Sequence, residues 1–172
     1  IIVDSGNTTY DSRNNCNAII ETATNTLIQG CQSTIIPNTV LKIDNYAFYK
    51  VGNLASITMP SSVVSIGQSA FNGCSGLTSV ILSNNLTSIE ASAFNNCTGL
   101  TKIFMPKSVT TIGRKAFAGC EGLQTIVFPN SVESIGEEAF SNCIYLKNVY
   151  VPLSVATIGE KAFDHGGEDI CY

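Results

Sequence analysis

The sequence predicts a right-handed, β-rich solenoid in which short strands from successive 23-residue coils form a curved parallel sheet. The strongest observation is an Ala-Phe pair that recurs every 23 residues, with its aromatic members at Phe48, Phe71, Phe94, Phe117, Phe140 and Phe163. An isoleucine precedes each of these phenylalanines by five residues, and a leucine follows each of the first five by six. A fixed period of this length is typical of stacked units that bury their apolar sides against one another.

Each coil is expected to contain two short strands and one turn. The first strand has the spacing L-x-x-L-x-L, as in Leu77, Val80 and Leu82, whose last two members share one face. Proline follows this strand in four coils and Ser83 in a fifth, and proline ends a strand because it cannot donate to the next one. A second apolar pair then leads to a glycine such as Gly113, and we expect a short helical or 3₁₀ turn from there through Ala-Phe. This arrangement is that of a leucine-rich-repeat solenoid.

Composition excludes several classes of function. The chain has 172 residues, 44% of them hydrophobic and only 13% charged, and its net charge is -4. Lysine and arginine form no cluster, so nucleic acid is not an expected partner. The apolar stretches fall far short of the ~20 residues that cross a bilayer, which predicts no membrane-spanning segment. No signal-peptide pattern opens the sequence, so any secretion signal is expected to have been removed or left out.

The period breaks near the N-terminus. Residues 1–36 are interpreted as a variant coil with an inserted β-hairpin, formed by the apolar stretches 18–20 and 26–28. This segment is expected to cover the open end of the stack as a cap. The alternative is that the chain is cut from a longer array. Regular repeats occupy residues 37–163, and residues 164–172 form an irregular tail.

The cysteines follow the repeat rather than a metal-binding or disulfide pattern. Four of them lie three residues after a repeat phenylalanine, at Cys74, Cys97, Cys120 and Cys143. Side chains in the same position of stacked coils point in parallel, so buried and reduced thiols are expected. No zinc site is predicted, because no C-x₂-C pair with a histidine neighbour is present. A bridge between Cys16 and Cys31 is left open, Cys171 has no evident partner, and the single His165 is expected in a solvated loop.

One row of outward positions suggests binding. The residue between the last two apolar positions of L-x-x-L-x-L points away from the core, and in five of six coils it is apolar or aromatic. A polar row lies two positions earlier. The candidate ligand-binding residues from the two rows are Ile35, Ile81, Phe104, Val127, Tyr150, Lys102 and Asn148. An equally weighted alternative is that such residues simply favour strands.

The unit S-V-x-x-I-G-x-x-A-F-x-x-C-x-x-L-x-x-I-x-x-P, which spans residues 37–163, resembles the BspA-like leucine-rich-repeat family. The segment from Tyr10 to Cys31 is similar to an element found in such proteins of gut bacteria. The last coil departs from the unit, with Gly166 in the cysteine position. The resemblance implies bacterial proteins that are secreted or exposed on the cell surface and act in adhesion to host or bacterial partners. It implies no catalytic residues.

These observations leave three hypotheses about function. The first is a secreted or cell-surface module that binds a protein or glycan, of host or bacterial origin, on the strand-lined face. The second is a structural spacer without a ligand of its own. The third is an enzyme with its site in the N-terminal insert, but no motif for a nucleophile, a metal or a phosphate supports it, and no cofactor is expected.

Overall fold

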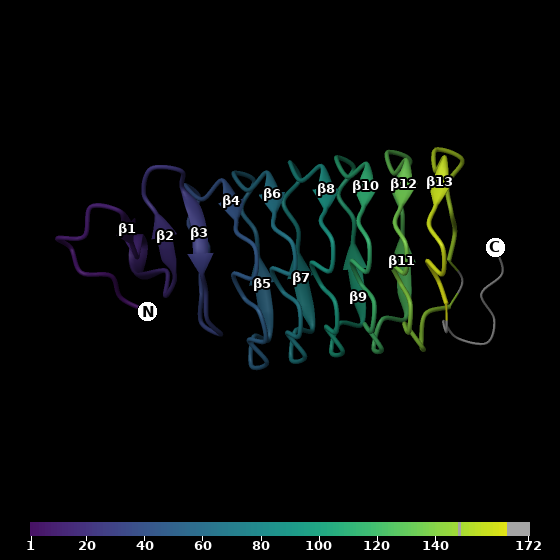
Figure 1. Cartoon of the computed structure of the whole chain (residues 1–172), viewed down its shortest axis with the longest axis horizontal. Helices are drawn as coiled ribbons and strands as arrows, with labels where there is room; N and C mark the ends of the chain where they lie inside the picture. The colour runs from purple at the N-terminus through teal and green to yellow at the C-terminus, as the bar shows by residue number, and fades with distance from the viewer. Residues whose placement is uncertain (148, 165–172) are drawn as a thin grey trace.

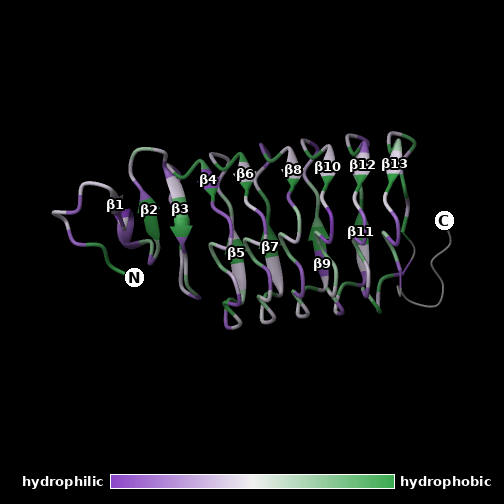
Figure 2. Cartoon of the chain, in the orientation of Figure 1, coloured by the Kyte–Doolittle hydropathy of each residue, from purple (hydrophilic) through white to green (hydrophobic). Residues whose placement is uncertain are grey.

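The computed structural model describes residues 1–147 and 149–164. It is an elongated β-solenoid whose coils lie side by side along the long axis, with the N-terminal segment at one end (Figure 1). Figure 2 shows that apolar and polar stretches alternate along each coil. The inward positions of neighbouring coils therefore join into one continuous core, and the predicted repeat architecture is confirmed.

The first set of strands carries the central part of L-x-x-L-x-L. It consists of β5 (Ser56–Thr58), β7 (Ser79–Ile81), β9 (Lys102–Phe104) and β11 (Thr125–Val127). The pairs β5–β7 and β9–β11 are parallel, and each residue faces the residue 23 positions away. An isolated bridge between Val127 and Tyr150 extends the set by one coil. In every strand the middle residue is buried and the flanking residues are exposed, as the pattern predicts.

The second set of strands runs along the other edge of the stack (Figure 1). It comprises β4 (Lys42–Ile43), β6 (Ser65–Ile66), β8 (Ser88–Ile89), β10 (Thr111–Ile112), β12 (Ser134–Ile135) and β13 (Thr157–Ile158). Neighbours again pair in parallel, in the order β4–β6 and β8–β10–β12–β13.

At the N-terminus, β1 (Tyr10–Asp11), a 3₁₀ helix η1 (Arg13–Asn15), β2 (Ile19–Glu21) and β3 (Thr26–Gln29) precede the regular coils. Strands β2 and β3 pair antiparallel, and β3 pairs in parallel with β4. Strand β3 of this hairpin therefore extends the second set of strands by one member at its N-terminal end. Arg13 links the segment by hydrogen bonds to Asp11, Asn25 and Thr39.

The segment around each Ala-Phe pair forms consecutive turns, where a short helical turn was expected. Alternate N–H groups close turns, as from Asn72 to the Ser69 carbonyl at 3.1 Å. The groups between them donate to the next coil, as from Phe71 to the Ala93 carbonyl at 2.8 Å. Ser69 has φ 55°. This left-handed residue directs the adjacent N–H groups along the stack, whereas a helix would return them to the same turn.

Glycine at the start of this turn serves close packing between coils. A Cβ on Gly113 would lie 2.8 Å from the Ala91 nitrogen of the preceding coil, which is closer than any side chain allows. Within the described residues, the glycines with φ in the left-handed region are Gly73 and Gly119, two positions after a repeat phenylalanine.

The repeat phenylalanines form a buried stack through the core, as predicted. Adjacent ring centroids lie 4.8 to 5.4 Å apart and the rings are within 11° of parallel. The four repeat cysteines lie beside this stack and are fully buried free thiols. Each donates a hydrogen bond to the carbonyl of a phenylalanine in the preceding coil, as from Cys97 Sγ to the Phe71 oxygen at 3.2 Å. Cys16 and Cys31 are also free thiols in the structure.

Candidate interaction surface

The strand-lined face is the exposed side of β5, β7, β9 and β11 together with residues 145, 147 and 150. Its outward row includes Ile81, Phe104, Val127 and Tyr150, whose exposed fractions run from 58% to 71%. These four residues belong to four consecutive coils. The pairings of Val127 with Phe104 and with Tyr150 place three of them in one line, and Ile81 lines a hollow together with Phe104. Four of the candidate residues thus lie together.

The other three candidates have different positions. Ile35 is 73% exposed, but it precedes the first regular coil and is separated from Ile81 by the coil that carries Thr58. Lys102 lies on β9 in the neighbouring polar row, with its ammonium nitrogen 5.7 Å from the centre of the Phe104 ring. This distance allows a cation–π contact, which orients both side chains. Asn148 lies outside the described residues.

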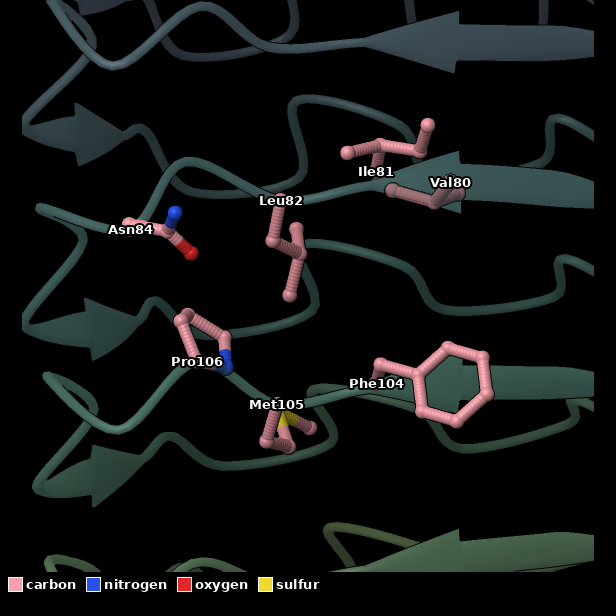
Figure 3. A pocket seen from close by; sticks show the side chains of 7 residues that line it. All are labelled: Val80, Ile81, Leu82, Asn84, Phe104, Met105 and Pro106. Atoms are coloured by element: carbon pink, nitrogen blue, oxygen red, sulfur yellow. The ribbon is translucent and has the colours of Figure 1, made fainter.

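A hollow of about 220 Å³ lies beside the outward row (Figure 3). Leu82 and Asn84 of one coil face Met105 and Pro106 of the next across it (Figure 3). The first of these coils has Ser83 where most of the others have proline. The Ser83 hydroxyl accepts a hydrogen bond from the Asn85 N–H, so the chain here turns by a local side-chain contact.

Sequence reasoning missed Tyr145, which is 59% exposed on the same face. It lines a second hollow, of about 390 Å³, with Gln124, Thr125 and Lys147. A signal for it exists in the sequence, because the equivalent position in three preceding coils is glycine, at Gly76, Gly99 and Gly122. The aromatic residue interrupts that column.

The face carries cations and no carboxylate among its described residues. Lys102 and Lys147 are exposed on it, while residues 55–58, 78–81, 101–104 and 124–127 include neither Asp nor Glu. The whole chain nevertheless has 13 acidic and 9 basic residues. The acidic side chains cluster elsewhere, for example in the pairs of Arg114 with Glu137 and Lys115 with Glu138 on the turns.

Within residues 1–147 and 149–164, no three His, Cys, Asp or Glu side chains gather as metal ligands would. The buried cysteines face the core and take no part in the surface. No helix over the same residues has the length and apolarity to cross a bilayer.

Comparison with known proteins identifies the family of this chain. The model of the BspA-type leucine-rich repeat region matches residues 41–167 in six copies. The chain belongs to the BspA-type leucine-rich repeat family. No curated protein matches it.

Solved structures agree with this membership in the BspA-type family. A leucine-rich cell surface protein from Faecalibacterium prausnitzii is 35% identical, with a TM-score of 0.73 over 89% of this chain. A leucine-rich repeat protein from Eubacterium ventriosum has a TM-score of 0.80 over 99% of the chain at 22% identity, and therefore supports the fold alone. The Treponema pallidum leucine-rich repeat protein is 25% identical over 92% of the chain and 86% of its own length, with a TM-score of 0.67. The chain spans 40% of the first of these proteins and 53% of the second.

Proposed function

We propose that this chain is a non-enzymatic interaction module of a secreted or cell-surface bacterial protein, which binds a protein or glycan on its strand-lined face. The observation that carries the proposal is the row of Ile81, Phe104, Val127 and Tyr150, exposed on four consecutive coils. Contiguous exposed apolar side chains are uncommon on a protein without partners and frequently mark interaction sites. Aromatic residues are also enriched among the contacts that dominate binding energy.

The residues of the outward row are available for binding because other residues form the core. Their neighbours in the same strands, Ile103 and Ile126, fill the core, so the fold is maintained by the inward positions. The outward positions could be polar without loss of packing, as Thr58 illustrates in the first strand of the set. A run of large apolar residues at positions that the fold does not require favours a binding role over a spacer role.

The test is the double substitution Phe104→Ser with Tyr150→Ser, measured against a panel of extracellular-matrix proteins and glycans. Binding should fall by about tenfold or more, while the melting temperature stays close to that of the unchanged protein. The matched control is Leu41→Ser with Val64→Ser, which removes exposed apolar side chains outside the strand-lined face. If both double variants bind every partner equally well, the coils serve as a spacer.

A further inference from the structure

A break in the glycine column sets the coil of Tyr145 apart from the three coils before it. In the preceding coils, a Cβ on Gly76 would lie 2.3 Å from the Gly52 oxygen, and one on Gly122 would lie 2.5 Å from the Thr98 oxygen. The glycines let each coil approach its predecessor closely enough for a hydrogen bond, as from the Gly122 N–H to the Thr98 carbonyl at 3.1 Å. Tyr145 occupies this position in the following coil.

The tyrosine removes that close approach. Over the residues that the structure describes, the Tyr145 N–H makes no hydrogen bond corresponding to those of Gly76, Gly99 and Gly122. The loss follows from geometry, because a side chain at this position would collide with the carbonyl of the preceding coil. The hollow between Tyr145, Lys147, Gln124 and Thr125 lies beside this position. The hollow thus coincides with this departure from the repeat.

The groups that line the hollow suit a sugar. Tyr145 offers an exposed ring that can cover the face of a pyranose, with a phenolic hydroxyl at its edge. Gln124 and Thr125 supply an amide and a hydroxyl that can both donate and accept hydrogen bonds. Lys147 adds a cation that forms no ion pair with any described residue. Such a set can bind hydroxyl groups and one negative charge.

The charge of the wider face points to an anionic ligand. Lys102 lies two coils from Lys147, roughly 10 Å along the stack, and the described positions of the face include no carboxylate. Glu121, which directly precedes Gly122, lines a different hollow on the turns with Lys115 and Glu138. Two cations this far apart match a polysaccharide with one carboxylate on each sugar better than a densely sulfated chain, which carries several charges on each sugar.

Backbone pairing argues against an extended acidic peptide as the ligand. A peptide that binds a sheet by strand addition needs an unpaired strand edge. The strands beside the hollow are stacked within the solenoid, and β11 pairs with β9 on one side while Val127 bridges to Tyr150 on the other. A ligand on this face therefore contacts side chains and not unpaired backbone groups.

We propose that the hollow beside Tyr145 is a subsite for a carboxylated sugar, and that the strand-lined face binds an acidic polysaccharide with Lys147 and Lys102 opposite its carboxylates. This inference rests on the proposed function and specifies its ligand class. The Tyr145 ring covers one sugar residue, Gln124 and Thr125 contact its hydroxyl groups, and Lys147 contacts its carboxylate. The outward row from Tyr150 to Phe104 contacts the neighbouring sugars.

The experiment measures binding of oligogalacturonate to the whole chain by calorimetry. Neutral galacto-oligosaccharides, dextran sulfate and polyglutamate serve as comparison ligands. Oligogalacturonate should bind most tightly, and its affinity should fall as salt is added, because screening weakens the contacts with lysine. Tyr145→Gly and Lys147→Gln should each lower the affinity by about tenfold or more.

The variants separate binding from folding. Tyr145→Gly restores the glycine of the preceding coils, so this variant should fold at least as well as the unchanged protein. Lys107→Gln removes an exposed cation outside the face and is the control for the loss of charge. Full oligogalacturonate binding by both Tyr145→Gly and Lys147→Gln would overturn the subsite. Equal or tighter binding of the neutral sugar, dextran sulfate or polyglutamate would overturn the ligand class, as would no binding of oligogalacturonate. The proposed function fails only if Phe104→Ser with Tyr150→Ser leaves every interaction intact.

Discussion

In this protein, the direction in which a side chain points from its coil determines whether it packs in the core or lies on the surface. Phe94 and Phe104 are ten positions apart in sequence; the first is fully buried between two other rings, and the second is 71% exposed. Phe94 lies 5.1 Å from one neighbouring ring and 5.4 Å from the other, both nearly parallel to it, so it gains contacts on both faces. The same residue type therefore serves the core at one position and the surface at the other.

Substitution of Phe94 by alanine should lower the free energy of unfolding by ~3–5 kcal/mol, because it leaves a cavity between two rings that are fixed by their own neighbours. Phe104→Ala is the matched control and should change stability by about 0.5 kcal/mol or less. Reversible denaturation of both variants provides the measurement. Similar losses for the two substitutions would contradict the assignment of strand faces.

At the scale of the structural elements, the cysteine column joins successive coils. Sγ of Cys74, Cys97, Cys120 and Cys143 donates to a phenylalanine carbonyl in the preceding coil at 3.0 to 3.2 Å. Burial raises the pKa of Cys74 to about 11. Hydrogen bonding with Cys97 and burial raise the pKa of Cys120. Cys74 and Cys120 are thus held as protonated thiols that donate to carbonyl groups inside the core.

Native alkylation should distinguish this column from Cys31. The thiolate is the reactive form, and Cys97 and Cys120 are both inaccessible, so they should remain unlabelled until the protein is unfolded. Burial raises the pKa of Cys31, but hydrogen bonds from Ser33 and Thr34 outweigh this effect and leave the pKa below its ordinary value. Cys31 should therefore be labelled before the cysteines of the column. Mass spectrometry after a short exposure checks the order, and early labelling of Cys120 would show that the core is open.

At the scale of the whole molecule, the two ends of the stack differ. The last described strand, β13, leaves Ile158 half exposed, whereas the equivalent Ile135 is buried. At the other end, β2 and β3 precede β4, and the backbone of Gly30 lies against the Phe48 ring. We propose that residues 1–36 cap the N-terminal end, because the antiparallel hairpin covers the first coil with a differently paired element.

The cap proposal predicts that Gly30→Ala destabilises the protein. A Cβ at this position would lie 2.1 Å from the Phe48 ring, which is itself held 4.8 Å from Phe71, so the cap must shift away from the stack. We expect a loss of ~1–3 kcal/mol and faster hydrogen exchange in β3 and β4. Gly52→Ala, whose Cβ would meet its nearest neighbour at an ordinary 3.5 Å, is the control. Unchanged exchange in β3 and β4 would mean that the hairpin does not protect this end.

The sequence by itself determined the coil, its length and the direction of most side chains. A 23-residue period identifies equivalent positions, and alternation along a strand separates inward from outward residues. These rules are local, so they were sufficient for the phenylalanine stack, for the buried cysteines and for the outward positions of Ile81, Phe104, Val127 and Tyr150.

The tertiary structure decided what depends on contact between coils. Left-handed residues such as Ser69 turn alternate N–H groups toward the next coil, so a turn forms where local pattern favours a helix. The hairpin strand β3 joins the second set of strands although the period breaks before it. The hollow at Tyr145 is lined by residues of two neighbouring coils, and the position of one residue in the repeat does not predict it. Periodicity specifies which positions are equivalent, whereas the distance between two coils depends on the bulk of the side chains that meet there.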